Sequence, residues 1–450
     1  MSRQQATLPP PLEDSYYYRD IRDRVVATES LQWQSRLRIR RTQLRLLRQL
    51  CVQARKHSPF YRERLANVDV DNLSWDDFQQ ITPLGRQELR DQADSIDCQE
   101  VPENQGNISV LVTSGSTGSP VEIRATEIVK MLWQVNALRD HLWHGRNASL
   151  TMGGIRWRAD KEAMAPEGWT LDDWGEPHNQ FYQTGPAFFL NSSSNVDQQL
   201  DWWLKNDPHY LISHPSNLRA LLQLIQSSGN KPERTLQLRT VGEQVPEDLR
   251  ELAQEVLDVP VIDSYSSQEL GYIALQCPEN DHYHVLSDSV VVEVVREDGS
   301  HCDPGELGQV LVTSLHNQVT PLIRYAIGDM AIAGEACACG RGLPVLTEIA
   351  GRVRNMLRLP DGSSRWPNFG FRKILEVAQL DQFQIVQTAL ESIEFRAVCK
   401  SELEPAQEDA IRQILKQHLG VDFEIAFSYP EEIPRSASGK YEDFVCDIKE

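Results

Sequence analysis

The first part of the chain alternates between short apolar runs and longer stretches with helical spacing. Short apolar runs bounded by turn residues predict strands at 108–113, 210–213, 236–241 and 261–262. Apolar positions that recur every three or four residues predict helices over 126–142, 216–229 and 246–257, the second with Ser216 as its N-cap. Strands that alternate with helices favour a parallel or mixed sheet.

The pattern changes after about residue 285. Strand-like runs at 289–295, 308–315 and 321–327 follow one another without helices, which indicates a β subdomain. Beyond residue 350 the chain predicts a separate α+β unit. This unit contains strands at 383–390 and 393–400, a helix at 405–419 closed by Gly420, and a final strand at 423–429.

Two other segments have less regular patterns. Residues 34–57 predict a basic amphipathic helix with an apolar stripe at Leu37, Leu44, Leu47, Cys51 and Ala54. We favour packing against the body of the protein over binding to a membrane or nucleic acid. Residues 151–195 show weak periodicity and are expected to form loops and short elements.

Composition narrows the class of protein. A length of 450 residues exceeds the size of one hydrophobic core, so at least two domains are expected. The net charge of -20 argues against nucleic acid or an anionic membrane as the partner. The sequence has no apolar run of about 18 residues and no signal-peptide pattern near its start. We therefore expect a cytoplasmic protein whose eight cysteines are reduced.

Two loops carry residues suited to phosphate chemistry. Residues 113–120, Thr-Ser-Gly-Ser-Thr-Gly-Ser-Pro, lie between a predicted strand and a predicted helix. Their glycines, hydroxyls and successive N–H groups can surround an anion, although a flexible linker is the alternative on composition alone. Residues 434–440, Pro-Arg-Ser-Ala-Ser-Gly-Lys, place Lys440 on a loop hinged by glycine. Such a lysine can reach developing negative charge, although most surface lysines are merely solvated.

Five short motifs follow one another along the chain: TSGSTGSP at 113–120, DSYSSQELG at 263–271, RYAIGD at 324–329, GR at 351–352 and PRSASGK at 434–440. In this order they resemble the adenylate-forming superfamily of acyl-CoA synthetases, peptide-synthetase adenylation domains and luciferases. Within it the chain is most similar to the phenylacetate–CoA ligase branch, also through SPFYRERL at 58–65 and HPSNLRALL at 214–222. The resemblance covers almost the whole chain.

The resemblance implies an α/β fold with two domains. A large N-terminal adenylate-forming domain at 1–350, with mixed sheets and a β subdomain, would bind ATP and the acyl group. A small mobile α+β domain at 351–450 would act as a lid and carry the catalytic lysine. The implied reaction is ATP-dependent activation of a carboxylic acid through acyl-AMP, with Mg²⁺, followed by transfer to CoA.

The same resemblance assigns residues to the nucleotide. Tyr265 would lie against the adenine beside a loop at Gly242 and Glu243, while Asp329 and Arg352 would contact the ribose. Taken singly, Tyr265 could be a core residue, Asp329 could cap a turn and Arg352 could form a surface ion pair. The residues that would hold the β- and γ-phosphates are Thr113, Ser114, Gly115, Ser116, Thr117 and Gly118.

The resemblance also assigns the catalytic groups. Glu269 would be linked to Mg²⁺, and Lys440 would bridge the acyl oxygen and the α-phosphate during adenylation. Two departures from the family pattern affect the details. Gln268 stands where a hydroxyl residue commonly precedes the glutamate, and Arg354 and Asn355 replace an acidic pair after the Gly-Arg motif. The phosphate contact and the position of the interdomain hinge are therefore left open, with residues 351–356 as the preferred hinge.

A set of cysteines and histidines suits a metal ion. Cys277 and His284 precede Cys337 and Cys339, and two such pairs could form a tetrahedral zinc site. The branch that the chain resembles has similar elements at these places, which favours His284 over His282. Four protein ligands would make the site structural. Buried free thiols are the alternative.

The acyl pocket is defined less well. An aromatic-rich stretch that includes Trp157, together with Ser213 and His214, is a candidate lining and suits an aryl or arylacetic acid. Ordinary packing is an equal alternative. Arg156, Arg158 or His214 could recognise a polar group on the acid.

Three classes of function follow from these features. The first is an acid–CoA ligase, with a small carboxylic acid and CoA as partners. The second is an adenylating enzyme that passes the acyl group to a carrier-protein thiol or an amine. The third, a non-catalytic nucleotide-binding or zinc-stabilised protein, is disfavoured because it would need neither Lys440 nor Glu269. A homodimer is one option for the state of assembly.

Overall fold

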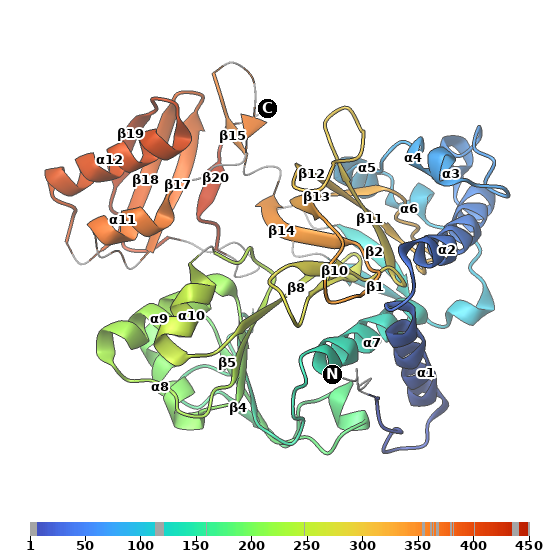
Figure 1. Cartoon of the computed structure of the whole chain (residues 1–450), viewed down its shortest axis with the longest axis horizontal. Coiled ribbons are helices and arrows are strands. Elements are labelled where there is room, and N and C mark those ends of the chain that lie inside the picture. The colour runs from blue at the N-terminus through green and yellow to red at the C-terminus, as the bar shows by residue number, and fades with distance from the viewer. Residues whose placement is uncertain are drawn as a thin grey trace.

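The computed structural model describes most of the chain, and its elements are labelled in Figure 1. The described residues are 7–112, 121–158, 160–246, 248–352, 356–360, 362, 364–365, 369–378, 380, 382–399, 401–433 and 441–448. Within them the strands form one twelve-stranded sheet, one four-stranded sheet and two two-stranded sheets. The protein thus has the mixed α/β character that the sequence predicts.

The twelve-stranded sheet has the order β11-β12-β13-β14-β10-β9-β8-β7-β6-β3-β5-β4. Its parallel half is formed by β3 (Met152–Arg156), β5 (Ala187–Asn191), β6 (Tyr210–Ser213), β7 (Gln237–Val241) and β8 (Val261–Ser267), with β4 (Trp169–Leu171) antiparallel at the edge. Its antiparallel half contains β9 (Gly271–Gln276), β10 (Tyr283–Val285), β11 (Val290–Val295), β12 (Leu307–Ser314), β13 (Tyr325–Gly334) and β14 (Val345–Arg352). The expected change from alternating elements to strands alone is confirmed.

Three helices cover one face of the parallel half: α8 (Val196–Asn206), α9 (Pro215–Ser228) and α10 (Leu249–Leu257) (Figure 1). Residues 151–195 form loops and short elements as expected, and two of these elements, β3 and β5, are strands inside the sheet. One expectation fails here. Ser216 is not the N-cap of α9, because Pro215 occupies the first helical turn and His214 is the N-cap. Proline favours that position because its missing N–H would have no partner there.

The antiparallel half packs against helices from the N-terminal part of the chain. These are α2 (Arg36–His57), α3 (Pro59–Arg64), α4 (Trp75–Gln79), α5 (Arg86–Asp91) and α6 (Ala93–Ile96). The basic helix forms as expected and packs on the body, and the Gln43 side chain donates to the carbonyl of Val290 at 2.9 Å. Its predicted stripe is wrong at Leu37, which is 61% exposed, whereas Ile39 and Leu50 are buried.

The glycine- and serine-rich loop is bordered by a small hairpin. β1 (Ile108–Val112) confirms the predicted strand, but it pairs with β2 (Glu122–Thr126), which the sequence analysis missed. The predicted helix follows as α7 (Glu127–Trp143) and packs against α1 (Tyr16–Leu31). Short 3-10 turns occupy Glu103–Gln105 and His178–Gln180.

The C-terminal part has a hydrophobic core of its own, built from residues between Leu357 and Phe444. Its four-stranded sheet has the order β19-β18-β17-β20, with β17 (Gln382–Ala389), β18 (Ser392–Val398), β19 (Glu424–Ser428) and β20 (Phe444–Cys446). The other elements are β15 (Leu357–Arg358), β16 (Ser364–Arg365), α11 (Phe371–Val377) and α12 (Pro405–Leu419). The helix bounds and Gly420 at its end are confirmed. The expected final strand is not the last, since β20 follows it and pairs with β17 in parallel.

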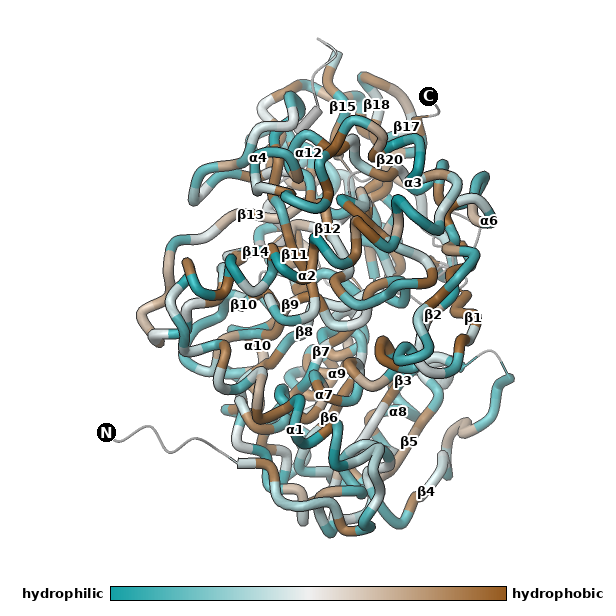
Figure 2. The backbone as a smooth tube through the Cα atoms, turned by 90° about the vertical axis from the view of Figure 1, so that its right-hand side faces the viewer, coloured by the Kyte–Doolittle hydropathy of each residue, from teal (hydrophilic) through white to brown (hydrophobic). Residues whose placement is uncertain are grey.

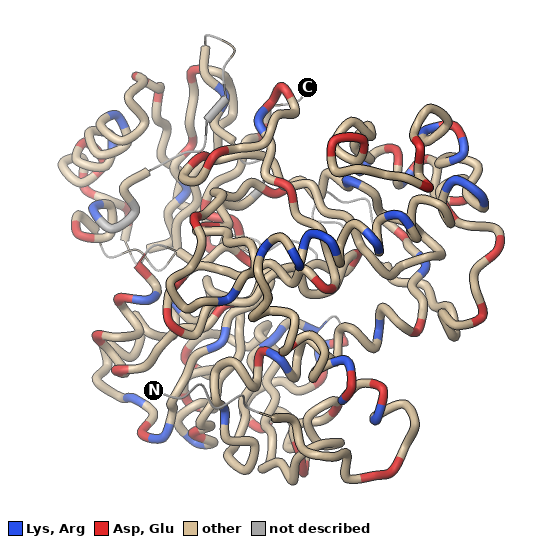
Figure 3. Tube along the Cα trace, turned by 45° about the vertical axis from the view of Figure 1, so that its right-hand side comes forward, with Lys and Arg blue, Asp and Glu red and all other residues tan. Residues whose placement is uncertain are grey.

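Hydrophobic residues gather in the middle of the molecule, whereas charged residues are spread along the chain. Figure 2 shows brown, hydrophobic segments along strands in the middle of the molecule. Figure 3 shows acidic and basic residues of both signs spread along the trace rather than gathered into one basic face. In the part of the chain that the structure describes, no helix combines the length and apolarity that a membrane span requires.

Candidate active site and metal centre

Tyr265 and Asp329 form a buried pair between β8 and β13. The Tyr265 hydroxyl donates a hydrogen bond of 2.7 Å to Oδ2 of Asp329, and both residues are less than a tenth exposed. The ladder between β13 and β14 places Asp329 opposite Arg352. Three positions that the resemblance assigns to the nucleoside are therefore adjacent in the fold.

The predicted adenine-side loop begins where β7 ends. Gly242 has φ +81°, a left-handed conformation that glycine adopts without the strain of a Cβ. The turn directs Glu243 toward the start of α9, where Oε2 accepts the N–H of Ser216 at 3.1 Å. A carboxylate is stabilised at this end of a helix by its unpaired N–H groups and the helix dipole. The position of Glu243 is thus fixed by the fold.

Glu243 also contacts the C-terminal part of the chain. Its Oε1 accepts the backbone N–H of Tyr441 at 2.8 Å. The Tyr441 hydroxyl donates to the carbonyl of Phe383 in β17, and Gln384 donates to the carbonyl of Glu442 at 2.9 Å. The segment that follows residue 440 is therefore held both to the C-terminal sheet and to the adenine-side loop.

Several predicted site residues belong to segments that the structure does not describe. Lys440 and the phosphate-loop residues lie outside the described residues, as do Arg354 and Asn355. The phosphate-loop residues are Thr113, Ser114, Gly115, Ser116, Thr117 and Gly118.

Glu269 is held by an arginine that the sequence analysis missed. Arg86, the first residue of α5, donates from a terminal guanidinium nitrogen to Oε1 of Glu269 at 3.0 Å. The same nitrogen lies 3.4 Å from the Tyr325 hydroxyl. Glu269 is 6% exposed, so this ion pair neutralises a nearly buried carboxylate. No motif marks Arg86, which lies far from Glu269 in the sequence.

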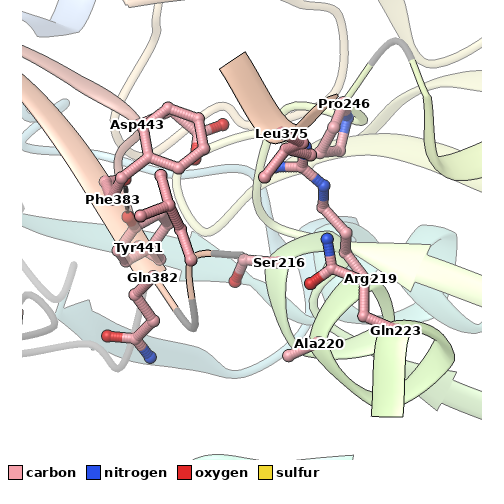
Figure 4. A pocket seen from close by; sticks show the side chains of 11 residues that line it. Ser216, Arg219, Ala220, Gln223, Pro246, Leu375, Gln382, Phe383, Tyr441 and Asp443 are labelled. Atoms are coloured by element: carbon pink, nitrogen blue, oxygen red, sulfur yellow. Dashed lines mark hydrogen bonds between the residues drawn. The ribbon is translucent and has the colours of Figure 1, made fainter. Parts of the chain in front are cut away.

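A groove separates the C-terminal part from α9 and the loop before α10. Figure 4 shows Ser216 and Arg219 on one side and Phe383, Tyr441 and Asp443 on the other. Burial raises the pKa of Asp443 to about 6. Arg219 opposes this shift, while the negative charges of Glu243 and Asp248 add to it. Acidic groups of both parts of the chain therefore meet beside the predicted adenine-side loop.

The predicted metal ligands come together in one cluster. Ligand atoms of Cys277, His284, Cys337 and Cys339 all lie within 4.8 Å of one another. The Sγ atoms of Cys277 and Cys337 are 3.9 Å apart, and Sγ of Cys339 is 3.4 Å from Nε2 of His284. His284 is the histidine of this cluster, and His282 lies beside it with its ring centre 5.3 Å away.

The donor set and its spacing fit tetrahedral zinc. Bonds of about 2.3 Å to sulfur and about 2.0 Å to nitrogen give ligand–ligand edges of roughly 3.5–3.8 Å in a tetrahedron. Burial lowers the pKa of His284 to about 3, which keeps the imidazole in its neutral, metal-binding form. Backbone N–H groups of Glu279, Cys339 and Arg341 point to cysteine sulfurs at 3.3–3.5 Å, as in sites that stabilise thiolates.

The candidate pocket residues have different surroundings. Ser213 is fully buried and its hydroxyl donates to the carbonyl of Ile155 at 2.6 Å. Nδ1 of His214 lies 3.0 Å from the carbonyl of Val241. Trp157 is 38% exposed just beyond the end of β3. Farther along the aromatic-rich stretch, Trp174 is buried and packs against Tyr210 with ring centres 5.6 Å apart.

Comparisons with known proteins agree with this architecture. The family model described as the CapK C-terminal domain matches residues 369–447. The chain is 24% identical over 448 residues to a phenylacetate-coenzyme A ligase of Thermus thermophilus, covering 90% of this chain and 96% of that protein. It is also 24% identical over 417 residues to the enzyme of the same name from Pseudomonas putida, with coverages of 86% and 89%.

Solved structures share the fold. A 2-hydroxyisobutyryl-CoA ligase in the postadenylation state, in complex with 2-HIB-AMP, matches with a TM-score of 0.69, 19% identity, and coverage of 90% of this chain and 89% of that chain. The same ligase in the thioesterification state, with 2-HIB-AMP and CoA, matches with a TM-score of 0.56 at the same identity and coverages. The chain therefore shares its fold with this acyl-CoA ligase and is similar to phenylacetate-coenzyme A ligases over most of its length.

Proposed function

We propose that this protein activates a carboxylic acid with ATP and then transfers the acyl group to CoA. In the first step a carboxylate oxygen attacks the α-phosphorus, the bond to the β-phosphate breaks, and pyrophosphate leaves. In the second step the CoA sulfur attacks the acyl carbon, AMP leaves, and the thiol proton is released. The ligases named above, which align with most of this chain, support the proposal.

The contact between Glu243 and Tyr441 is the observation on which the proposal chiefly rests. Lys440 directly precedes Tyr441 in the sequence and lies outside the described residues. We propose that Lys440 neutralises charge on the acyl oxygen and the α-phosphate during adenylation. The loop at 113–118 would hold the phosphates as they leave.

The other proposed roles belong mainly to buried polar residues. Asp329 would accept hydrogen bonds from the ribose hydroxyls, oriented by the 2.7 Å bond from Tyr265, and Arg352 would add a contact there. The body of Tyr265 would support the adenine together with Gly242 and Glu243. Glu269 would hold Mg²⁺, which would offset charge between the phosphates and the incoming carboxylate.

The two parts of the chain are proposed to act as domains, 1–350 and 351–450, that change their relative orientation between steps. The separate core of the C-terminal part supports this division. The arrangement in the structure is closer to the postadenylation form of the structural relative, with a TM-score of 0.69 against 0.56 for its thioesterification form. Rotation of a lid is a common way to assemble two successive sites.

The four-residue cluster is proposed to hold a structural zinc ion. Three cysteines and one histidine would fill a tetrahedral shell and leave no open position for chemistry. The ion would join the β9–β10 turn to the loop that carries Cys337 and Cys339. We also propose a cytoplasmic location, where the eight cysteines, none of them in a disulfide, would stay reduced.

A product assay tests the proposed function. The protein is incubated with ATP, Mg²⁺ and a panel of aryl, arylacetic and aliphatic acids, with and without CoA, and products are identified by mass spectrometry. Acyl-AMP without CoA and acyl-CoA with it are expected. Acyl-AMP that does not react with CoA, but does react with a carrier protein or an amine, would favour the second class of function.

A further inference from the structure

Two arginines share one face of the parallel half of the sheet. Arg156 ends β3, and Arg239 lies two residues before the end of β7. The ladders align Gly154 with Ile212 and Ile212 with Arg239. Because side chains alternate between the faces of a strand, Arg156, Gly154 and Arg239 lie on the same face. Both arginines are thus near the carboxyl ends of parallel strands, where such sheets bind ligands.

This face is not the one that α8, α9 and α10 cover. The neighbouring residues Ile155, Leu211 and Leu238 point the other way and are buried in the core with those helices. By contrast, Ile212 and Arg239 are only partly buried and Arg156 is exposed. The arginine face is therefore open to solvent at this edge of the sheet.

A pair of aromatic side chains lies near these arginines. The ring centres of Trp133, from α7, and Tyr272, from β9, are 5.1 Å apart. Burial raises the pKa of the Tyr272 hydroxyl, and the charges of Asp140, Arg239 and Arg156 also act on it. Tyr272 and the two arginines thus share one electrostatic environment.

Arg156 differs from the other two candidates for recognising a polar group. Arg158 forms an ion pair with Asp160, and its guanidinium carbon lies 4.5 Å from the ring centre of Trp169. His214 is engaged by the carbonyl of Val241. Among the described residues, the Arg156 side chain is exposed and has no hydrogen bond or ion pair. Its guanidinium is therefore accessible and available to a ligand.

Positive charge exceeds negative charge among the groups that act on these arginines. Asp140 is shared by two arginines, at 2.7 Å from Arg146 and 2.6 Å from Arg239. Its side chain is 1% exposed, and Arg146 also donates to Gln237 at 2.6 Å. One carboxylate thus pairs with both Arg146 and Arg239, and Arg156 has no acidic partner among the described residues. A local excess of positive charge attracts anions even when the whole chain is acidic.

We propose that the acid activated by this protein carries a second anionic group, bound by the guanidiniums of Arg156 and Arg239 and the Tyr272 hydroxyl. This inference rests on the proposed function and specifies its substrate class as dicarboxylic acids or acids with an equivalent anionic substituent. A guanidinium recognises a carboxylate with paired, charge-assisted hydrogen bonds. The Trp133 and Tyr272 rings would cover the carbon skeleton between the two charged ends.

Binding can be measured without relying on catalysis. The probes are benzene dicarboxylates and straight-chain dicarboxylates, each compared with its own monomethyl ester, which has the same skeleton but one charge less. Affinities are determined by titration calorimetry in the presence of α,β-methylene-ATP, which blocks adenylation. For the best diacid, we expect binding about tenfold or more tighter than its ester, as for hydrogen bonds to charged groups.

Two variants assign the effect to Arg156. Arg156→Ala should reduce the preference for the diacid to about twofold or less, and Arg156→Lys should restore part of it. Arg158→Ala, a matched removal of a nearby half-buried arginine that pairs with Asp160, should keep the preference. Equal affinity for diacid and ester in the wild type, or an unchanged preference in Arg156→Ala, would overturn the inference. Preferential adenylation of acids that lack a second anionic group would also overturn the inference, while leaving the proposed ligase reaction intact.

Discussion

The backbone N–H of Tyr441 lies 2.8 Å from Oε1 of Glu243, whose other oxygen accepts the N–H of Ser216 at 3.1 Å. One carboxylate therefore bridges the start of α9 and the segment that follows residue 440. The bridge links the two parts of the chain next to the buried Tyr265–Asp329 pair. In the proposed mechanism it defines the arrangement in which adenylation occurs.

Glu243→Ala should slow adenylation more than thioester formation. The change removes the acceptor that joins the lid to the adenine-side loop, so we expect a loss of about 10- to 100-fold in acid-dependent ATP–pyrophosphate exchange, as for the loss of a partner to a charged acceptor. The reaction of supplied acyl-AMP with CoA should change less than threefold. Glu255→Ala, on the exposed side of α10, is the matched control. Equal losses in both half-reactions would argue against the bridge as an adenylation contact.

Tyr265→Phe and Asp329→Ala should raise the KM for ATP to different extents. Tyr265→Phe removes one hydrogen bond to Asp329, which corresponds to a rise of roughly 2- to 10-fold in the KM for ATP. Asp329→Ala also removes the proposed ribose acceptor together with this hydrogen bond, so a larger rise is expected. The measurement is ATP dependence of pyrophosphate exchange at saturating acid. A smaller effect for Asp329→Ala than for Tyr265→Phe would contradict the assignment.

Cys339→Ser should lower both metal content and thermal stability. A hydroxyl is a poor replacement for a thiolate in a site of three sulfurs and one nitrogen. Elemental analysis should find about one zinc ion per chain in the wild type, much less in the variant, and a lower Tm. Cys302→Ser, a partly buried thiol outside the cluster, should retain the zinc. A wild-type protein free of zinc after purification without chelators would disprove the metal assignment.

The contact between the C-terminal part and the large N-terminal part, called docking below, should strengthen as pH falls through about 6. In the docked arrangement the pKa of Asp443 is raised to about 6, chiefly by burial, so that form holds a proton that a solvent-exposed Asp443 lacks. Docking is therefore favoured as pH falls from 7 toward 4 and is opposed above 6, where a charged carboxylate must lie near Glu243 and Asp248. Energy transfer between dyes on the two domains can follow this shift. Asp443→Asn should remove it, whereas Asp447→Asn, at an exposed position, should not.

Much of the fold could be predicted from local patterns. α12 shows apolar spacing with Pro405 at its start and Gly420 at its end, and the structure has these bounds. β3 was missed because Gly153 and Gly154 weaken its strand pattern. Glycine is required here by a tertiary contact, because a Cβ at Gly153 would lie 2.5 Å from the Pro208 ring. Local propensity contains no information about such an approach.

Prediction of the candidate site from the sequence has the same limit. The cysteine and histidine cluster was predicted from residue types and spacing, and the nucleotide-site positions from motif order. Arg86 and Asp443 were not found, because their roles depend on partners that are distant in the sequence. Arg156 was one of three candidates until the structure showed that Arg158 and His214 are engaged by other groups.

Acid-dependent ATP–pyrophosphate exchange in the wild type and in Lys440→Ala tests the central claim most directly. With an acid identified by the product assay, the wild type should exchange label, and the variant should lose about a hundredfold or more of that rate at an unchanged Tm. Exchange in Lys440→Ala that matches the wild type would contradict the account, as would a wild type that exchanges no label with any acid.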